Sequence, residues 1–141
     1  MNIDIRPASS DDLPALLALD HLAQQPGSGR REFIHRVCAA NTCWVAILDD
    51  AVAGYGVLEY SFYECGFLAM LYVHQDYRRR GLGQALLEHF ETICQTPKLF
   101  TSTNLTNLPM QSLLAKRGYT LSGVIHNLDD GDPELVYFKR L

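Results

Sequence analysis

The sequence lacks a hydrophobic run long enough to cross a membrane and lacks cysteines paired at metal-binding spacing. A transmembrane helix would need about 18 or more consecutive apolar residues, and the first residues have no apolar core of the kind that a signal peptide needs. Cys38, Cys43, Cys65 and Cys94 form no C-x-x-C pair, so neither a zinc site nor a disulfide framework is expected. These absences predict a cytoplasmic protein with buried free thiols, no bound metal and no membrane partner.

Basic residues are also scarce. The chain has 12 Lys and Arg against 16 Asp and Glu, which gives a formal net charge of −4 at pH 7. A nucleic-acid-binding protein needs a basic face to neutralise phosphates, so no nucleic-acid partner is expected. The hydrophobic share of 48% is ordinary for a globular protein. We therefore expect a single domain over residues 1–141, and the composition leaves a homodimer open.

Hydrophobic periodicity divides the chain into alternating short strands and helices. The expected strands cover residues 3–6, 43–48, 52–60, 63–73, 99–103, 119–126 and 135–139. The expected helices cover residues 10–19, 33–41, 82–94 and 109–117. Gly54 and Gly56 lie within one of these strands and indicate a bulge or a close approach of another segment.

The most informative segment runs from Leu71 to Leu87 and reads LYVHQDYRRRGLGQALL. An apolar strand gives way to three arginines and two glycines, and an amphipathic helix follows. Such a loop places unpaired backbone N–H groups and positive charge at a helix N-terminus, where an anion such as a pyrophosphate docks. A basic strand-to-helix turn that binds nothing is the alternative for the same residues.

The pattern Arg78-x-x-Gly81-x-Gly83 resembles the acyl-coenzyme A loop of the GNAT acetyltransferase superfamily. The resemblance implies an α/β (α+β) fold with a central, mainly antiparallel, mixed sheet of six to seven strands and about four flanking helices. It implies acetyl-CoA as the acyl donor and no metal. The residues expected to bind this cofactor are Leu71, Tyr72, Val73, Arg78, Arg79, Arg80, Gly81, Leu82, Gly83, Gln84 and Asn107.

A second match lies downstream, where Asn107, Gly118 and Tyr119 fall at the spacing of a later segment of that family. The resemblance assigns the Asn107 side chain to the pantetheine arm. An asparagine just before a helix is also a routine N-cap, and both interpretations stay open.

Backbone groups of Leu71, Tyr72 and Val73 are implied, by the same resemblance, to bind the pantetheine arm and to polarise the acetyl carbonyl as an oxyanion site does. A buried strand without a ligand is compatible with these residues as well. Because the attacking amine must be neutral, a general base is useful. Glu59 and Glu64 are the candidate bases, with surface hairpin glutamates as the alternative, and His74 is a lesser candidate beside Asp76.

Two positions depart from the pattern of the family. Leu114 stands where many members carry a tyrosine that protonates the leaving thiolate, and Ser102 stands where the ribosomal-protein and N-terminal acetyltransferases carry a glutamate. The expected function is acetyl transfer to a primary amine of a small-molecule acceptor by direct attack in a ternary complex. A protein or peptide N-acetyltransferase and an acyl-CoA-binding sensor with little catalysis are the alternatives.

Overall fold

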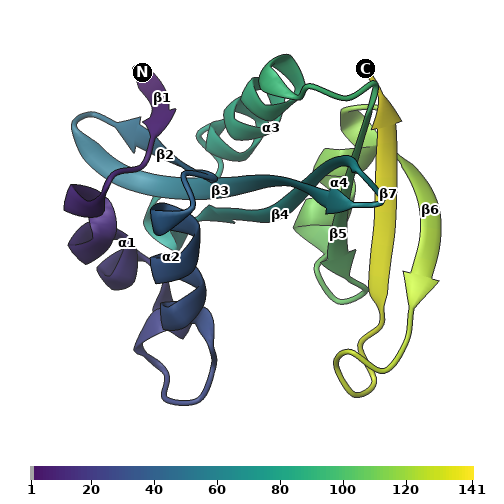
Figure 1. The fold of residues 1–141 in the computed structure, drawn as a ribbon, viewed down its shortest axis with the longest axis horizontal. Helices are drawn as coiled ribbons and strands as arrows, with labels where there is room; N and C mark the ends of the chain where they lie inside the picture. The colour runs from purple at the N-terminus through teal and green to yellow at the C-terminus, as the bar shows by residue number, and fades with distance from the viewer. Residues whose placement is uncertain (1) are drawn as a thin grey trace. The chain divides into compact units, whose positions relative to one another are not determined.

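The computed structural model describes residues 2–141 (Figure 1). Its strands are β1 (Ile3–Pro7), β2 (Cys43–Leu48), β3 (Ala51–Phe62), β4 (Cys65–Val73), β5 (Lys98–Asn104), β6 (Thr120–Ile125) and β7 (Glu134–Arg140). Its helices are α1 (Leu13–Leu19), α2 (Arg30–Ala39), α3 (Leu82–Ile93) and α4 (Leu108–Lys116), with short 3-10 turns η1 (Ser10–Asp12), η2 (His21–Gln24) and η3 (Gln75–Tyr77).

The strands form one seven-stranded sheet in the order β1-β2-β3-β4-β5-β7-β6. The pairs β1–β2, β2–β3, β5–β7 and β6–β7 are antiparallel, whereas β4 and β5 run parallel. A mainly antiparallel mixed sheet with four α-helices, as counted over residues 2–141, confirms the fold class that the sequence predicts.

Contacts divide the chain into two compact units, which are described separately. The first unit comprises the chain up to Leu58 together with Met70–Phe90, and the second comprises Glu59–Ala69 together with Glu91–Leu141.

In the first unit, helices cover both faces of β2 and β3. Tyr55 points toward the side of α1 and α2, where its hydroxyl reaches Asp20. The neighbouring Gly56 faces α3, because a Cβ at this position would collide with the ring of Phe90. Alternate residues of a strand point to opposite faces, so α1 and α2 lie on one face and α3 on the other (Figure 1).

The α3 helix is held by a stripe of apolar side chains. Leu82, Leu86, Leu87 and Phe90 are each exposed by 1% or less. Leu82, Leu86 and Phe90 follow one another at steps of four residues, and Leu87 lies three residues before Phe90, which places all four on one side of the helix. Each such side chain contributes about 1.5–3 kcal/mol when it is fully buried, so this stripe fixes the position at which the helix begins.

A carboxylate organises the second unit. Glu91 accepts hydrogen bonds from Arg117 Nη2 at 3.0 Å, from the Tyr119 hydroxyl at 2.8 Å and from Lys139 Nζ at 3.2 Å. Burial and the hydrogen bond to Glu91 raise the pKa of Tyr119, so this hydroxyl stays protonated as a donor. The cluster joins the end of α3 to β7 and to the residues that follow α4.

Several sequence-based expectations were wrong in detail. The second helix, expected over residues 33–41, begins at Arg30 and ends at Ala39. The fourth strand begins at Cys65 and not at Tyr63, because Tyr63 and Glu64 have φ values of 52° and 63° and form the turn after β3. The first helix begins as the 3-10 turn η1 before α1. Of the four free cysteines, two are only half-buried, namely Cys65 and Cys94.

Over the described part of the chain, no helix combines the length and the apolar character that spanning a membrane requires.

Candidate functional site

The α3 helix begins directly after the arginine and glycine loop. The N–H of Ala85 donates to the Gly81 carbonyl at 2.9 Å, which is the first hydrogen bond of the helix. The N–H groups before Ala85 therefore have no partner within the helix. No acidic residue lies in the first turn, so the positive end of the helix dipole is not neutralised by its own side chains. This end of α3 is suited to an anionic ligand.

The loop itself contains two residues in the left-handed region. Arg79 has a φ of 64° and Gly81 a φ of 81°. Left-handed residues in a short loop turn successive N–H groups toward one concave side, which is a known geometry of anion-binding loops. A Cβ built at Gly81 would meet nothing within 4 Å, so the space beside this glycine is open.

The three arginines of the loop have different surroundings. Arg78 donates from Nε to the carbonyl of Val73 at 3.0 Å, which ties the loop to the end of β4. The guanidinium of Arg80 lies 5.9 Å from the ring centre of Tyr77. Arg78, Arg79 and Arg80 are all exposed, so the loop carries its positive charge at the surface.

The backbone of β4 presents polar groups on its side away from β3. The N–H of His74 donates to the Ala53 carbonyl at 2.9 Å, and the Tyr72 carbonyl lies against Gly54. In an antiparallel strand, the N–H and C=O of one residue point to the same side. Those of the next residue point to the opposite side. Tyr72 therefore bonds toward β3, and the polar backbone groups of Leu71 and Val73 point away from it. The Val73 carbonyl is taken by Arg78 Nε, and the contact of the Leu71 and Val73 N–H groups with an acetyl carbonyl stays a prediction.

Gly54 and Gly56 are explained by close approaches in the first unit. A Cβ at Gly54 would lie 2.5 Å from the Tyr72 carbonyl oxygen, and a Cβ at Gly56 would overlap the ring of Phe90. The pairing of β2 with β3 also shifts register between Ala46 and Ile47. The sequence predicted a bulge or a close approach at these glycines, and the close approach is confirmed.

The remaining cofactor candidates differ in environment. Leu82 is buried in the core, and the Gln84 side chain donates to Glu88 at 3.0 Å. In the second unit, the Asn107 side chain accepts from the N–H of Met110 at 3.2 Å and is the N-cap of α4. The capping interpretation of Asn107 is therefore confirmed, and its contact with a cofactor stays a prediction.

The candidate bases lie in and beside the β3–β4 hairpin. Glu59 is half-buried near the end of β3, and Glu64 is exposed in the turn that precedes β4. Glu64 is thus at the opposite end of β4 from Val73. His74 accepts the N–H of Asp76 on Nδ1 at 3.1 Å and caps η3, which is a structural role.

The two departures from the family pattern have distinct settings in the second unit. Leu114 is fully buried in α4, and Ser102 is half-buried in β5. Neither residue carries an ionisable group, so neither can take over the role of the missing tyrosine or glutamate.

A buried polar cluster, which the sequence did not reveal, lies between α1 and α2 in the first unit. The Asp20 carboxylate is 0% exposed and accepts from Arg30 Nη1 at 2.6 Å, from the Tyr55 hydroxyl at 2.7 Å and from the N–H of Leu22 at 3.0 Å. Burial, followed by the hydrogen bond to Asp20, raises the pKa of Tyr55, so its hydroxyl remains a donor. The cluster fixes the backbone of η2.

The Tyr72 side chain extends over the same region. Its hydroxyl lies 3.0 Å from His21 Nδ1, 3.4 Å from the N–H of His21 and 3.4 Å from the Leu19 carbonyl. The rings of Tyr72 and Tyr55 are 5.8 Å apart. The strand that carries the predicted acetyl-binding backbone is therefore connected directly to η2. The sequence does not predict this connection, because Tyr72 and His21 are 51 residues apart and meet only in the folded chain.

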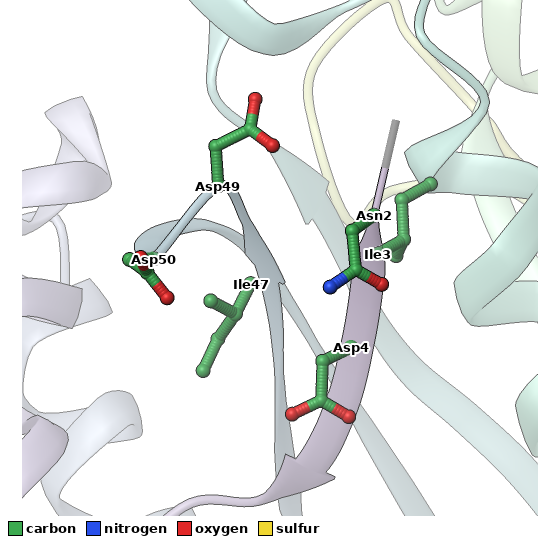
Figure 2. A pocket seen from close by; sticks show the side chains of 6 residues that line it. All are labelled: Asn2, Ile3, Asp4, Ile47, Asp49 and Asp50. Carbon is green, nitrogen blue, oxygen red and sulfur yellow. The ribbon is translucent and has the colours of Figure 1, made fainter.

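A shallow hollow in the first unit lies elsewhere. It is bounded by the start of β1 and the turn after β2, and Figure 2 shows its six lining residues, Asn2, Ile3, Asp4, Ile47, Asp49 and Asp50. None of the predicted cofactor or base residues lines it. In residues 2–141, no group of three or more His, Cys, Asp or Glu side chains is placed to hold a metal ion.

Comparison with known proteins gives a consistent result. The family model for the acetyltransferase (GNAT) family matches residues 11–119. A crystal structure of a GNAT-family acetyltransferase from Bacillus cereus ATCC 10987 is 30% identical, with a TM-score of 0.90 over 99% of this chain and 98% of that chain. The sequence matches no curated protein at a significant level.

Two more distant structures share the fold. The ribosomal-protein-S18-alanine N-acetyltransferase from Escherichia coli is 20% identical, with a TM-score of 0.79 over 99% of this chain and 94% of that one. A structure from Bacillus anthracis str. Ames, in complex with acetyl coenzyme A, is 17% identical, with a TM-score of 0.64 over 70% of this chain and 61% of that chain. On the family model and the Bacillus cereus structure, the chain belongs to the GNAT family of acetyltransferases.

Proposed function

We propose that this chain transfers the acetyl group of acetyl-CoA to a primary amine of a small-molecule acceptor, by direct attack within a ternary complex. The observation that carries the proposal is the loop between β4 and α3 together with the start of α3, where the N–H groups before Ala85 have no partner within the helix. It combines strand N–H groups directed away from β3, a loop with two left-handed residues and a helix N-terminus with no acidic residue in its first turn.

The residues present fit this cofactor. We assign the pyrophosphate to the N–H groups between Arg79 and Gln84, since these precede the first bond of α3 and lie beside the open space at Gly81. The exposed arginines of the loop add charge-assisted contacts to phosphate. When bound, acetyl-CoA supplies the acetyl group as an activated thioester.

The protein itself orients acetyl-CoA and polarises its acetyl carbonyl. We assign the N–H groups of Leu71 and Val73 as the donors to the acetyl carbonyl, because their direction follows from the pairing of β4 with β3. Preorganised donors of this kind stabilise developing negative charge without reorganisation, and one such donor is worth about 3 kcal/mol. Glu59 and Glu64 stay candidate bases for the acceptor amine.

The location of the protein is part of the same proposal. All four cysteines are free, which is usual in a reducing compartment. We therefore place the enzyme in the cytoplasm.

A turnover assay tests the proposal. Purified protein is incubated with acetyl-CoA and, separately, with polyamines, amino acids, aminoglycosides and peptides, while thiol release and product mass are recorded. Acetylation of a small amine is the expected result. Acetylation of peptides alone would contradict the proposal that the acceptor is a small molecule. Binding of acetyl-CoA without transfer to any amine would contradict the proposal that the protein is an enzyme and would favour an acyl-CoA-binding sensor.

A further inference from the structure

One side chain of the loop that is assigned to the pyrophosphate reaches the end of β4. Arg78 donates from Nε to the Val73 carbonyl at 3.0 Å. In the described part of the chain, its two Nη groups have no hydrogen bond or ion pair to another residue, and the residue is exposed. A guanidinium has five N–H donors in one plane, so four of them are available to a ligand while Nε is engaged.

The peptide group between Val73 and His74 is held from both sides. Its N–H, which belongs to His74, donates to the Ala53 carbonyl of β3 at 2.9 Å. Its carbonyl, which belongs to Val73, accepts from Arg78 on the opposite side. Because a peptide group is planar, two bonds at its opposite ends fix the orientation of the whole plane.

This peptide group closes β4, and β5 does not support it. The pairing of β4 with β5 covers Gly66 to Leu68, and after Val73 the chain turns into η3. The end of a strand opens easily unless another group holds it. Arg78 is therefore the protein group that holds Val73 on the side away from β3.

The same side of Val73 carries the N–H that is assigned to the acetyl carbonyl. The N–H and C=O of one residue in an antiparallel strand point to the same side, so the donor lies on the side where Arg78 binds. Such a donor stabilises developing negative charge because it is oriented before the reaction starts. A bond that fixes Val73 therefore also orients this donor.

We propose that Arg78 is a positioning residue that couples the two ends of the bound cofactor, with its Nη groups on the pyrophosphate and its Nε on the Val73 carbonyl. This inference rests on the proposed function and deepens it. It gives Arg78 a role that the other two arginines of the loop do not share. In residues 2–141, neither Arg79 nor Arg80 has a hydrogen bond to β4, and Arg80 lies over the ring of Tyr77.

Two substitutions separate the hydrogen bond of Arg78 from its charge. In Arg78→Gln, the amide nitrogen is bonded to Cδ, as Nε of arginine is, so the donor stays while the charge and the Nη groups are lost. In Arg78→Lys, the charge stays while a methylene takes the place of Nε. If Arg78 supplied only charge, lysine would replace it and glutamine would not.

The positioning role predicts that the two variants fail in different ways. The rate of acetyl transfer is measured in a single turnover at saturating acetyl-CoA, and the affinity is measured by calorimetry. We expect Arg78→Gln to bind acetyl-CoA about tenfold more weakly and to keep the transfer rate within about twofold of wild type. We expect Arg78→Lys to keep its affinity and to lose about tenfold in rate, which is less than the loss from removing an oxyanion donor outright.

Arg31→Gln is the control for these kinetics. Arg31 is an exposed arginine of α2, so the variant removes the same charge from a place away from the loop. We expect both its affinity and its transfer rate to stay within about twofold of wild type.

A second readout does not depend on turnover. Hydrogen exchange at the His74 N–H reports how firmly its peptide group is held against Ala53. Inorganic pyrophosphate is the probe, because it has no pantetheine arm with which to contact β4. At saturation we expect it to slow this exchange several-fold in wild type and in Arg79→Met, and to leave it unchanged in Arg78→Met.

The outcomes separate the two levels of the proposal. An Arg78→Lys variant with the wild-type rate beside a slow Arg78→Gln overturns the positioning role while acetyl transfer stands. Unchanged exchange at His74 in wild type saturated with pyrophosphate overturns it as well, and this result needs no variant. A wild-type protein that binds acetyl-CoA and acetylates no amine overturns the proposed function, whereas slowed exchange would still support the tie between the loop and β4.

Discussion

Replacing Tyr55 with phenylalanine removes one hydroxyl from the most buried polar cluster of the protein and leaves the ring in place. Tyr55 and Asp20 are each 0% exposed, and the hydroxyl donates to the carboxylate at 2.7 Å. The variant therefore tests whether this hydrogen bond holds η2 in position.

The structure sets the size of the effect. A hydrogen bond to a charged group is worth about 1.5–3 kcal/mol. Tyr55→Phe opens no large cavity, and Asp20 keeps Arg30 and the N–H of Leu22 as partners. We therefore expect the free energy of unfolding to fall by about 2 kcal/mol. Asp20→Ala should cost more, about 3–5 kcal/mol, because it leaves the half-buried Arg30 without its counter-ion.

Urea unfolding followed by circular dichroism measures both changes at neutral pH. Tyr60→Phe is the matched control, because the Tyr60 hydroxyl accepts an N–H at 3.1 Å but its residue is 38% exposed. We expect the control to stay within about 0.5 kcal/mol of wild type. If Tyr55→Phe were as stable as this control, with an unchanged denaturant slope, the cluster would not hold η2 in the way described here.

Further predictions concern packing, ligand linkage, acid stability and thiol chemistry. Gly56→Ala should destabilise the protein by about 1–3 kcal/mol in urea, because the added Cβ meets the Phe90 ring; an unchanged midpoint would refute this close packing. Acetyl-CoA at about 100 times its dissociation constant should raise the free energy of unfolding by about 2.7 kcal/mol, and an unmoved melting temperature would exclude the cofactor. The hydrogen bond from Arg6 lowers the pKa of Asp12, so the stability that this carboxylate adds is present above about pH 4 and is lost as the pH falls further. Asp12→Asn should therefore be less stable than wild type near pH 6, and the gap should narrow near about pH 3; a gap that widens toward acid would contradict the assignment. Burial raises the pKa of Cys43, so a thiol reagent should leave it unmodified in the native protein, and rapid labelling seen by mass spectrometry would contradict this.

Local patterns predicted most of the fold. A continuous run of six apolar residues located β2 to the residue, and Gly118 ends the last helix with a φ of 85°, as a C′ glycine does. The turn at Tyr63 and Glu64 was missed because neither residue is of a type that usually adopts a positive φ. At these two residues, the pairing of β3 with β4 overrides the local preference for a negative φ.

The candidate site was predictable only where its chemistry lies in consecutive residues. The loop from Arg78 to Gly83 is such a segment, because its glycines and arginines adjoin the helix start. The cluster around Asp20 is not, since its tyrosine partner lies 35 residues away in the sequence. No local sequence pattern marks an aspartate that will be buried. Only the folded chain shows which residues neutralise its carboxylate.

The most direct test of the central claim is a calorimetric titration of acetyl-CoA into the wild-type protein and into Gly83→Val. Gly83 lies in the first turn of α3, beside the unpaired N–H groups assigned to the pyrophosphate. Gly123→Val is the control, because a Cβ at Gly123 meets nothing within 4 Å in β6. We predict one binding event per chain for wild type and for the control, and no measurable binding for a folded Gly83→Val. Absence of binding by wild type, or equal affinity in all three proteins, would contradict the account.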